Sequence, residues 1–186
     1  MNKKPWRSVE SEVLADGPVK IVHERLKTPE GDILDYYYQP RKTQVVFVLP
    51  LTENGTVLMI EQYRHPTGGF LLEIPAGKVE KGEDLASAAR RELLEETGAR
   101  AGELVPLPSF YPQPSFNAAI FNPFLAFNVT VVSEQQLESG ELLKVVELPL
   151  PEVYRLLARG EIRDASSALT LHYAKAELAR RGLSVD

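Results

Sequence analysis

The stretch GKVEKGEDLASAARRELLEETGA, residues 77–99, predicts a glycine-containing loop that leads into a helix at 84–97. Asp84 is a suitable N-cap because its carboxylate can accept hydrogen bonds from backbone N–H groups of the first turn. Gly98 follows the last helical residue, where a left-handed conformation commonly ends a helix. Small alanines in the helix let one side pack closely on a sheet. The stretch therefore predicts a capped helix that packs on other elements.

One face of this helix carries three glutamates beside an arginine. At about 100° per residue the four side chains cover an arc of roughly 140°; they are Arg91, Glu92, Glu95 and Glu96. Carboxylates four residues apart repel each other by roughly 0.2–0.5 kcal/mol. One interpretation is a solvated acidic face, and the other is a site for a hard divalent cation, which prefers oxygen ligands. Arg91 cannot ligate a metal but can orient Glu95 from one turn away.

These residues resemble the signature of the Nudix hydrolases, G-x5-E-x7-R-E-U-x-E-E-x-G-U, in which U is aliphatic. Every specified position is filled, by Gly77, Glu83, Arg91, Glu92, Leu93, Glu95, Glu96, Gly98 and Ala99. Seven fixed residues would coincide at background frequencies with a probability on the order of 10⁻⁸ per start position. The resemblance implies an α/β fold, a Nudix-type α/β/α sandwich with a mixed sheet.

The resemblance also implies a divalent metal cofactor, Mg²⁺ or Mn²⁺. Carried over residue by residue, it makes Glu92 and Glu96 the principal metal ligands and Glu95 a further ligand or support. The backbone carbonyl of Ala76 becomes an additional ligand, and Glu83 stabilises the geometry of the loop and the helix.

Segments outside the signature resemble the ADP-ribose and nucleotide-sugar pyrophosphatase branch of that family. They are EQYR at 61–64, EIPAG at 73–77, Pro114, and GEIRDA at 160–165. This branch implies hydrolysis of the diphosphate bond of nucleoside diphosphate sugars, ADP-ribose included, to a nucleoside monophosphate and a sugar phosphate. The alternatives are a dinucleoside polyphosphate or capped-RNA pyrophosphohydrolase, and a non-catalytic nucleotide-sugar-binding module.

Candidate substrate-binding residues follow from the same resemblance. The arginine that matches Arg64 contacts the diphosphate in this branch, and guanidinium groups suit phosphate oxygens. The full expected set is Arg64, Arg41, Tyr37, Glu73, Pro114 and Phe116. The run after Pro114, SFNAA, lacks the glycine and glutamate that ADP-ribose enzymes often carry there. We therefore expect a nucleotide-sugar specificity broader than ADP-ribose alone.

The reaction needs a general base that accepts a proton from water. In the resembled branch this base is a loop glutamate well downstream of the signature, and Glu138 and Glu141 occupy that region. We favour Glu141 of the two. The expected catalytic set is Glu141, Glu138, Arg91 and Glu95.

The remaining sequence predicts short strands at 9–14, 19–26, 33–38, 45–51, 57–62, 70–74, 104–106, 121–132 and 143–148, and helices at 150–159 and 165–181. Residues 1–42 form a small antiparallel β region in this interpretation, and residues 43–186 form the Nudix hydrolase domain. Branch members are commonly dimers whose N-terminal strands help to build the partner's site. We expect a homodimer in which Arg41 or Tyr37 reaches the nucleotide across the interface.

Composition sets limits on the kind of partner. The 186 residues carry a net charge of −5 and contain no cysteine, which excludes disulfides and thiolate metal sites. An acidic protein is a poor non-specific binder of nucleic acids or anionic membranes. Neither an apolar segment behind the basic N-terminus nor a run of about 20 apolar residues is present. We expect a cytoplasmic protein with a small-molecule substrate and neither nucleic-acid nor membrane partners.

Overall fold

The computed structural model describes residues 5–185, which divide into two compact units. The first unit takes the described residues up to Thr43 together with Gln113–Ile120, and the second takes Gln44–Pro112 with the described residues from Phe121 onward. Two segments far apart in the sequence thus contribute to each unit.

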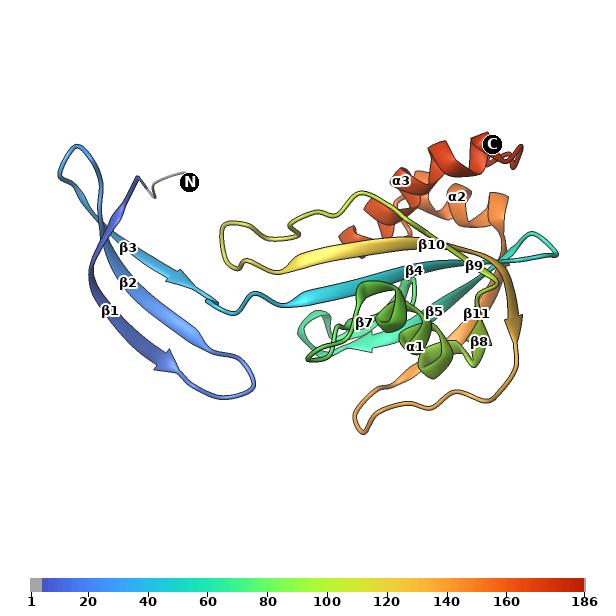
Figure 1. Ribbon diagram of the computed structural model, residues 1–186, viewed down its shortest axis with the longest axis horizontal. Helices are drawn as coiled ribbons and strands as arrows, with labels where there is room; N and C mark the ends of the chain where they lie inside the picture. The colour runs from blue at the N-terminus through green and yellow to red at the C-terminus, as the bar shows by residue number, and fades with distance from the viewer. Residues whose placement is uncertain (1–4, 186) are drawn as a thin grey trace. The chain divides into compact units, whose positions relative to one another are not determined.

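The first unit is a three-stranded antiparallel sheet in the order β1-β2-β3, drawn in blue in Figure 1. Its strands are β1 (Arg7–Ala15), β2 (Ile21–Lys27) and β3 (Ile33–Tyr38). The distant segment joins this sheet through backbone and side-chain hydrogen bonds. The Gln39 N–H donates to the carbonyl of Phe116 over 2.8 Å, and the Tyr36 hydroxyl donates to the carbonyl of Ser115 over 2.7 Å.

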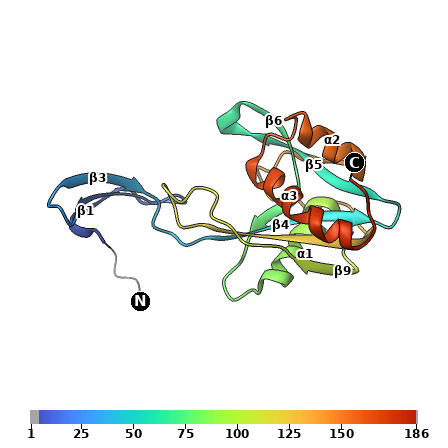
Figure 2. The same cartoon turned by 90° about the horizontal axis from the view of Figure 1, so that it is seen from above.

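The second unit is built on a sheet whose path is β11-β5-β4-β10-β8, with β6 paired to β5, β7 to β4 and β9 to β10. Figure 2 shows the β5 and β6 hairpin in green, closed by a short 3-10 turn, η1 (His65–Thr67). The strands are β4 (Gln44–Thr52), β5 (Thr56–Arg64), β6 (Gly69–Glu73), β7 (Ala76–Lys78), β8 (Ala99–Arg100), β9 (Glu103–Pro106), β10 (Ile120–Val131) and β11 (Leu143–Pro149).

Helices cover both faces of this sheet: α1 (Leu85–Thr97) one face, α2 (Leu150–Ala158) and α3 (Ala165–Arg180) the other (Figure 1). Successive side chains of a strand point to opposite faces, and β4 shows the alternation. Val46 and Val48 pack in the cluster with α1, whereas Phe47 and Leu49 pack in the cluster with α2 and α3. The predicted α/β/α sandwich with a mixed sheet and an antiparallel N-terminal region is confirmed.

Both ends of α1 follow from its sequence. The Asp84 carboxylate accepts hydrogen bonds of 3.0 Å from the N–H groups of Ala86 and Ser87. Gly98 ends the helix with a left-handed φ of 68°. A Cβ atom on Gly98 would also lie 2.0 Å from the carbonyl oxygen of Ser133. Glycine is therefore needed at this position for conformation and for space.

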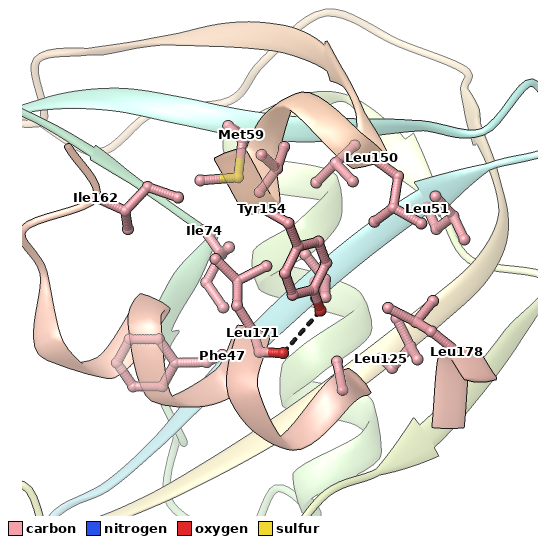
Figure 3. Packing of buried hydrophobic residues seen from close by; sticks show 14 of the residues in the cluster. Phe47, Leu51, Met59, Ile74, Leu125, Leu150, Tyr154, Ile162, Leu171 and Leu178 are labelled. Atoms are coloured by element: carbon pink, nitrogen blue, oxygen red, sulfur yellow. Dashed lines mark hydrogen bonds between the residues drawn. The ribbon is translucent and has the colours of Figure 1, made fainter. Parts of the chain in front are cut away.

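The larger core lies between the sheet and the two C-terminal helices (Figure 3). Tyr154 on α2 is buried there, and its hydroxyl donates a hydrogen bond of 2.7 Å to the carbonyl of Leu171 on α3. This bond satisfies a polar group in an apolar setting and ties the two helices together. Burial raises the pKa of Tyr154, so its hydroxyl stays protonated.

Three short elements were not expected from the sequence: η1, β7 and β8, which have two or three residues each. Segments this short show no periodicity; β7 and β8 form by pairing with the longer strands β4 and β10, and η1 is the turn between β5 and β6. Within residues 5–185, no helix combines the length and the apolar composition that a membrane crossing requires.

Candidate active site

A cavity of about 550 Å³ collects most of the residues singled out from the sequence, all from the second unit. It is lined by Val45, Phe47, Arg64, Glu73, Ala76, Gly77, Lys78, Glu80, Arg91, Glu92, Glu95, Glu96, Phe121, Gln136, Glu138, Glu141, Asp164 and Ser166. Two aromatic rings meet in its wall, because Phe47 and Phe121 lie 4.8 Å apart between centroids.

Strand pairing explains where the cavity opens. β5 pairs with β4 at Val57 but with β6 over residues 60–64, while β4 pairs with β7 over residues 45–47. The sheet therefore divides beyond the β4–β5 hairpin. β7 then brings the loop that precedes α1 beside the glutamates of the helix.

Two of those glutamates, Glu92 and Glu96, are buried against β7. Glu96 accepts a hydrogen bond of 2.8 Å from the N–H of Ala76. A Cβ atom on Gly77 would lie 1.9 Å from Cδ of Glu92, so only glycine leaves room for this carboxylate. The two carboxylates are thus fitted to the backbone of the strand.

Burial and neighbouring charge make both carboxylates weak acids. Burial raises the pKa of Glu96 to about 8, and the carboxylates of Glu92 and Glu141 add to the effect. Burial also raises the pKa of Glu92, with Glu95 and Glu141 contributing, although Arg91 opposes the shift. Burial therefore outweighs the positive charge that Arg91 supplies to Glu92 and Arg64 supplies to Glu96.

Arg91 links three glutamates of the signature. Its Nε and Nη2 donate to the Glu83 carboxylate over 3.0 Å each, and its Nη1 donates to Glu92 over 2.8 Å and to Glu95 over 2.9 Å. Nη2 also reaches the carbonyl of Lys78 over 2.9 Å. Arg91 lowers the pKa of Glu83 and keeps it ionised. This network fixes the loop to the helix.

Arg64, at the end of β5, also lines the cavity. Its Nε and Nη2 donate to the Glu73 carboxylate over 3.0 and 2.6 Å in a bidentate pair. The Glu73 side chain is 4% exposed, whereas that of Arg64 is 43% exposed. Glu73 therefore acts as a buried anchor, and these bonds raise the pKa of Arg64. The anchored guanidinium adds a fixed positive charge to the wall.

Glu138 and Glu141 come from the loop that precedes β11. The loop is attached to the C-terminal end of α1, where the Gln136 N–H donates to the carbonyl of Glu95 over 2.7 Å and Nε2 of Gln135 donates to the carbonyl of Glu96 over 2.5 Å. Glu141 is partly buried and Glu138 is exposed. The Glu138 N–H donates to the Glu141 carboxylate over 2.8 Å and so orients it.

A model of the NUDIX domain matches residues 41–169. The chain belongs to the Nudix family. This match covers the whole cavity lining, from Val45 to Ser166.

Two relatives and one solved structure are similar to this chain. An ADP-ribose pyrophosphatase of Bacillus subtilis (strain 168) is 39% identical over 129 residues, 69% of this chain and 70% of the relative. A GDP-mannose pyrophosphatase of Yersinia pestis (strain Pestoides F) is 32% identical over 165 residues, 81% of this chain and 80% of the relative. A crystal structure of an ADP compounds hydrolase shares the fold with a TM-score of 0.88 and 22% identity, over 99% of this chain and 100% of that chain.

The Nudix glutamates fit a divalent cation by the chemistry of their donors. Within residues 5–185, no three acidic or histidine side chains already converge as a finished ion site. Glu92 and Glu96 nevertheless place buried carboxylates at the cavity. Hard divalent ions take carboxylate, carbonyl and water oxygens, and Glu92 and Glu96 supply the first kind.

Four predicted substrate residues belong to the first unit and do not line this cavity: Tyr37, Arg41, Pro114 and Phe116. The Tyr37 ring stacks on His23 with 4.5 Å between centroids and is 53% exposed. Pro114 lines a second cavity of about 500 Å³ within the first unit, with Trp6, Tyr36 and Tyr38 among its other lining residues. Their roles toward substrate stay predictions.

Several lining residues were missed in the sequence, among them Asp164, Ser166, Gln136 and Glu80. Asp164 could have been found as the N-cap of a helix, because DASSAL has the composition of a helix start. The Nudix signature lies some 70 residues earlier in the chain. The sequence alone does not show that this helix start and the signature line the same cavity.

Proposed function

We propose that this Nudix hydrolase cleaves the diphosphate bond of nucleoside diphosphate sugars, ADP-ribose included, to a nucleoside monophosphate and a sugar phosphate. The observation that carries the proposal is the pairing, in one cavity, of the signature glutamates with an arginine held by a buried carboxylate. The relatives named as ADP-ribose and GDP-mannose pyrophosphatases support the same substrate class.

Arg64 binds the diphosphate in this proposal. Glu73 occupies Nε and Nη2 of the guanidinium, and no residue within 5–185 forms a hydrogen bond with Nη1. The group is therefore held in one orientation with one nitrogen left for a phosphate oxygen. Charge-assisted bonds between guanidinium and phosphate are among the stronger hydrogen bonds in proteins.

Glu92 and Glu96 hold Mg²⁺ or Mn²⁺, with Glu95 and the Ala76 carbonyl as further oxygen donors. When bound, the ion neutralises charge on the diphosphate and lowers the pKa of coordinated water. Arg91 keeps the ligands in place, because it donates to Glu92 and Glu95 at the same time.

Glu141 is the general base in this proposal. It accepts a proton from water while the water oxygen forms a bond to one phosphorus and the P–O bond of the anhydride breaks, so that the leaving phosphate carries the electron pair. Its charge acts on Glu92 and Glu96 and its side chain is partly buried, which supports Glu141 over the exposed Glu138. Glu138 orients Glu141 through its backbone N–H.

The first unit contributes to the substrate site across a homodimer interface in this proposal. The exposed Tyr37 ring and the exposed Arg41 are available to a nucleotide, and Pro114 and Phe116 belong to the segment that joins this unit. A sedimentation experiment tests the dimer, and a monomer at micromolar concentration would contradict it. The cytoplasmic location stays a prediction from the sequence.

The decisive experiment is a panel of nucleoside diphosphate sugars incubated with the enzyme and Mg²⁺, with products separated by chromatography. We expect a nucleoside monophosphate and a sugar phosphate from several sugars. Preferred cleavage of dinucleoside polyphosphates or capped RNA would reject the proposal, and so would wild-type turnover that EDTA does not change.

Glu96→Gln provides the matched variant, because it keeps the shape of the side chain and its bond from Ala76 but removes the charge. We expect turnover to fall by about 100-fold or more, while the circular dichroism spectrum stays that of the wild type. Glu138→Gln and Glu141→Gln distinguish the two base candidates, and we expect the larger loss of kcat for Glu141→Gln.

A further inference from the structure

The N-terminal end of α3 forms part of the cavity wall, which the proposed mechanism has not used. Asp164 is the N-cap of this 16-residue helix, and Ser166 lies in its first turn. Both residues line the cavity together with Arg64 and Glu96. The charge of Asp164 also acts on Arg64, so the two groups lie near each other.

Two adjacent serines in this turn behave differently. Ser167 is fully buried, and its hydroxyl donates to Asp164 over 2.7 Å and accepts from the Ile74 N–H over 3.0 Å. Ser166 is only 6% exposed, yet its hydroxyl has no hydrogen-bonding partner within residues 5–185. Every fully enclosed side-chain nitrogen or oxygen of the described residues does have a partner. The Ser166 hydroxyl is therefore open to the cavity that it lines.

Asp164 offers a second unused group at the same helix start and in the lining of the same cavity. One carboxylate oxygen, Oδ2, accepts from the N–H and the hydroxyl of Ser167 over 2.7 Å each. The other, Oδ1, has no hydrogen-bonding partner within residues 5–185. Because Ser167 is in turn fixed to β6 and its following residue Ile74, the free oxygen is held in place rather than left to rotate.

The chemistry of this pair excludes a phosphate and fits a diol. A helix N-terminus alone favours anions, but the Asp164 carboxylate at this end repels them. A sugar hydroxyl can donate to Oδ1, and its neighbour can accept from or donate to the Ser166 hydroxyl. Two vicinal hydroxyls would thus satisfy both unused groups at once, while the diphosphate stays on Arg64.

We propose that Asp164 and Ser166 form a subsite for a vicinal diol of the substrate and so determine its specificity. This inference rests on the proposed hydrolysis of nucleoside diphosphate sugars. The diol belongs either to the terminal sugar or to the ribose of the nucleoside, which present the same chemistry. Sites that hydrogen-bond a substrate hydroxyl reject analogues that lack it, because the buried partners are then left unpaired.

The test compares Ser166→Ala with the wild type on three substrates: ADP-ribose, the β-methyl ester of ADP, which lacks the terminal sugar, and ADP-ribose without the 2′ and 3′ hydroxyls of its adenosine. We expect kcat/KM for ADP-ribose to fall by about tenfold, the scale of one hydrogen bond. The loss should be much smaller on one analogue, and that analogue identifies the sugar that binds. An equal loss on all three substrates, or no loss, would overturn the proposal.

A second pair of variants distinguishes the loss of the Ser166 hydroxyl from a change in folding. Ser166→Thr and Ser166→Val have the same shape, but only threonine keeps the hydroxyl, so we expect threonine to recover most of the discrimination between substrates and valine to recover none. Binding of ribose 5-phosphate and of AMP, measured by calorimetry, provides a readout without turnover. Wild type that cleaves none of the three substrates would reject the proposed function, whereas wild type and Ser166→Ala with identical preferences would reject the subsite alone.

Discussion

The Glu92 carboxylate lies where a side chain at Gly77 would begin, since a Cβ atom there would be 1.9 Å from Cδ and 2.0 Å from Oε1. Glycine at this position is therefore required by a neighbouring functional group. Arg91 also restrains Glu92 through a 2.8 Å bond, so the carboxylate cannot move aside without breaking this contact.

We predict that Gly77→Ala displaces the Glu92 carboxylate and reduces kcat/KM by about 100-fold, because misplacement of a catalytic group by about 1 Å costs this much. The melting temperature should also fall, because the displaced carboxylate breaks its bond from Arg91, so activity is compared well below it. Gly17→Ala is the matched control, since a Cβ atom on Gly17 meets nothing within 4 Å. Full activity of Gly77→Ala would show that Glu92 needs no fixed position.

Glu96 gives the metal-free protein a pH-dependent stability. Its pKa is about 8 in the folded protein against an ordinary value of 4.5, because it is buried near other carboxylates. Between these two pH values the unfolded chain has released a proton that the folded chain keeps. The free energy of unfolding therefore decreases as pH rises from about 4.5 to 8.

We predict that the melting temperature in EDTA falls across this pH range and that Glu96→Gln makes the curve flatter. Mg²⁺ competes with the proton, so its stabilising effect should be larger at pH 8 than at pH 5. Differential scanning calorimetry measures both effects. A curve of Glu96→Gln parallel to that of the wild type would contradict this account.

Gly98 and Gly160 allow the stability cost of a left-handed backbone to be measured separately from the cost of a steric collision. Both have a left-handed φ, 68° and 71°, but only a Cβ on Gly98 meets backbone atoms. Gly160→Ala should cost about 1–2 kcal/mol from backbone strain, or roughly 2–4 °C in melting temperature for each kcal/mol. Gly98→Ala adds a collision with Ser133 and should cost more.

Gly98→Ala should also lower activity, because the N–H groups of Val132 and Ser133 both donate to the Gly98 carbonyl at the start of the loop that carries Glu141. Gly160→Ala should keep its activity below its melting temperature. The stability losses of the two variants are measured by circular dichroism. Equal losses would show that the loop at Ser133 moves aside at no cost in free energy.

Glu73→Gln tests the anchor of Arg64. The amide keeps one acceptor oxygen but loses the charge, so the bidentate pair is broken and the guanidinium is free to rotate. We predict a rise in KM of about tenfold with a smaller change in kcat, since Arg64 binds the ground state and the transition state alike. Glu61→Gln, which breaks a surface ion pair of 2.7 Å with Lys144, is the control and should leave both constants near wild type.

Local features of the fold could be predicted from the sequence. The cap at Asp84 and the left-handed Gly98 each depend on a few neighbouring residues, and the structure has both. β7 was missed because Ala76–Lys78 has no pattern of its own and pairs with Val45–Phe47 only after the sheet has formed.

Parts of the site depend on contacts between distant segments, which a single sequence does not encode visibly. The sequence predicts that Glu73 contacts the substrate. In the structure Glu73 is buried and paired with Arg64, so that it holds the Arg64 guanidinium in place. The open hydroxyl of Ser166 differs from the closed one of Ser167, which bonds to Asp164 and to the Ile74 N–H that follows β6. Ser167 lies in the core and its neighbour Ser166 lines the cavity, and this difference can be seen only once the sheet is assembled.

The cavity takes its acidic wall from α1 and its Asp164–Ser166 wall from α3, helices that cover opposite faces of the sheet. Replacements at residues 164–166 therefore change the α3 wall of the cavity without altering any residue of the signature. After a gene duplication, the sequence at the start of α3 can change while the signature residues are conserved by selection for hydrolysis. A mutant library confined to those three positions, selected on unfamiliar nucleotide sugars, would retrace such divergence in the laboratory.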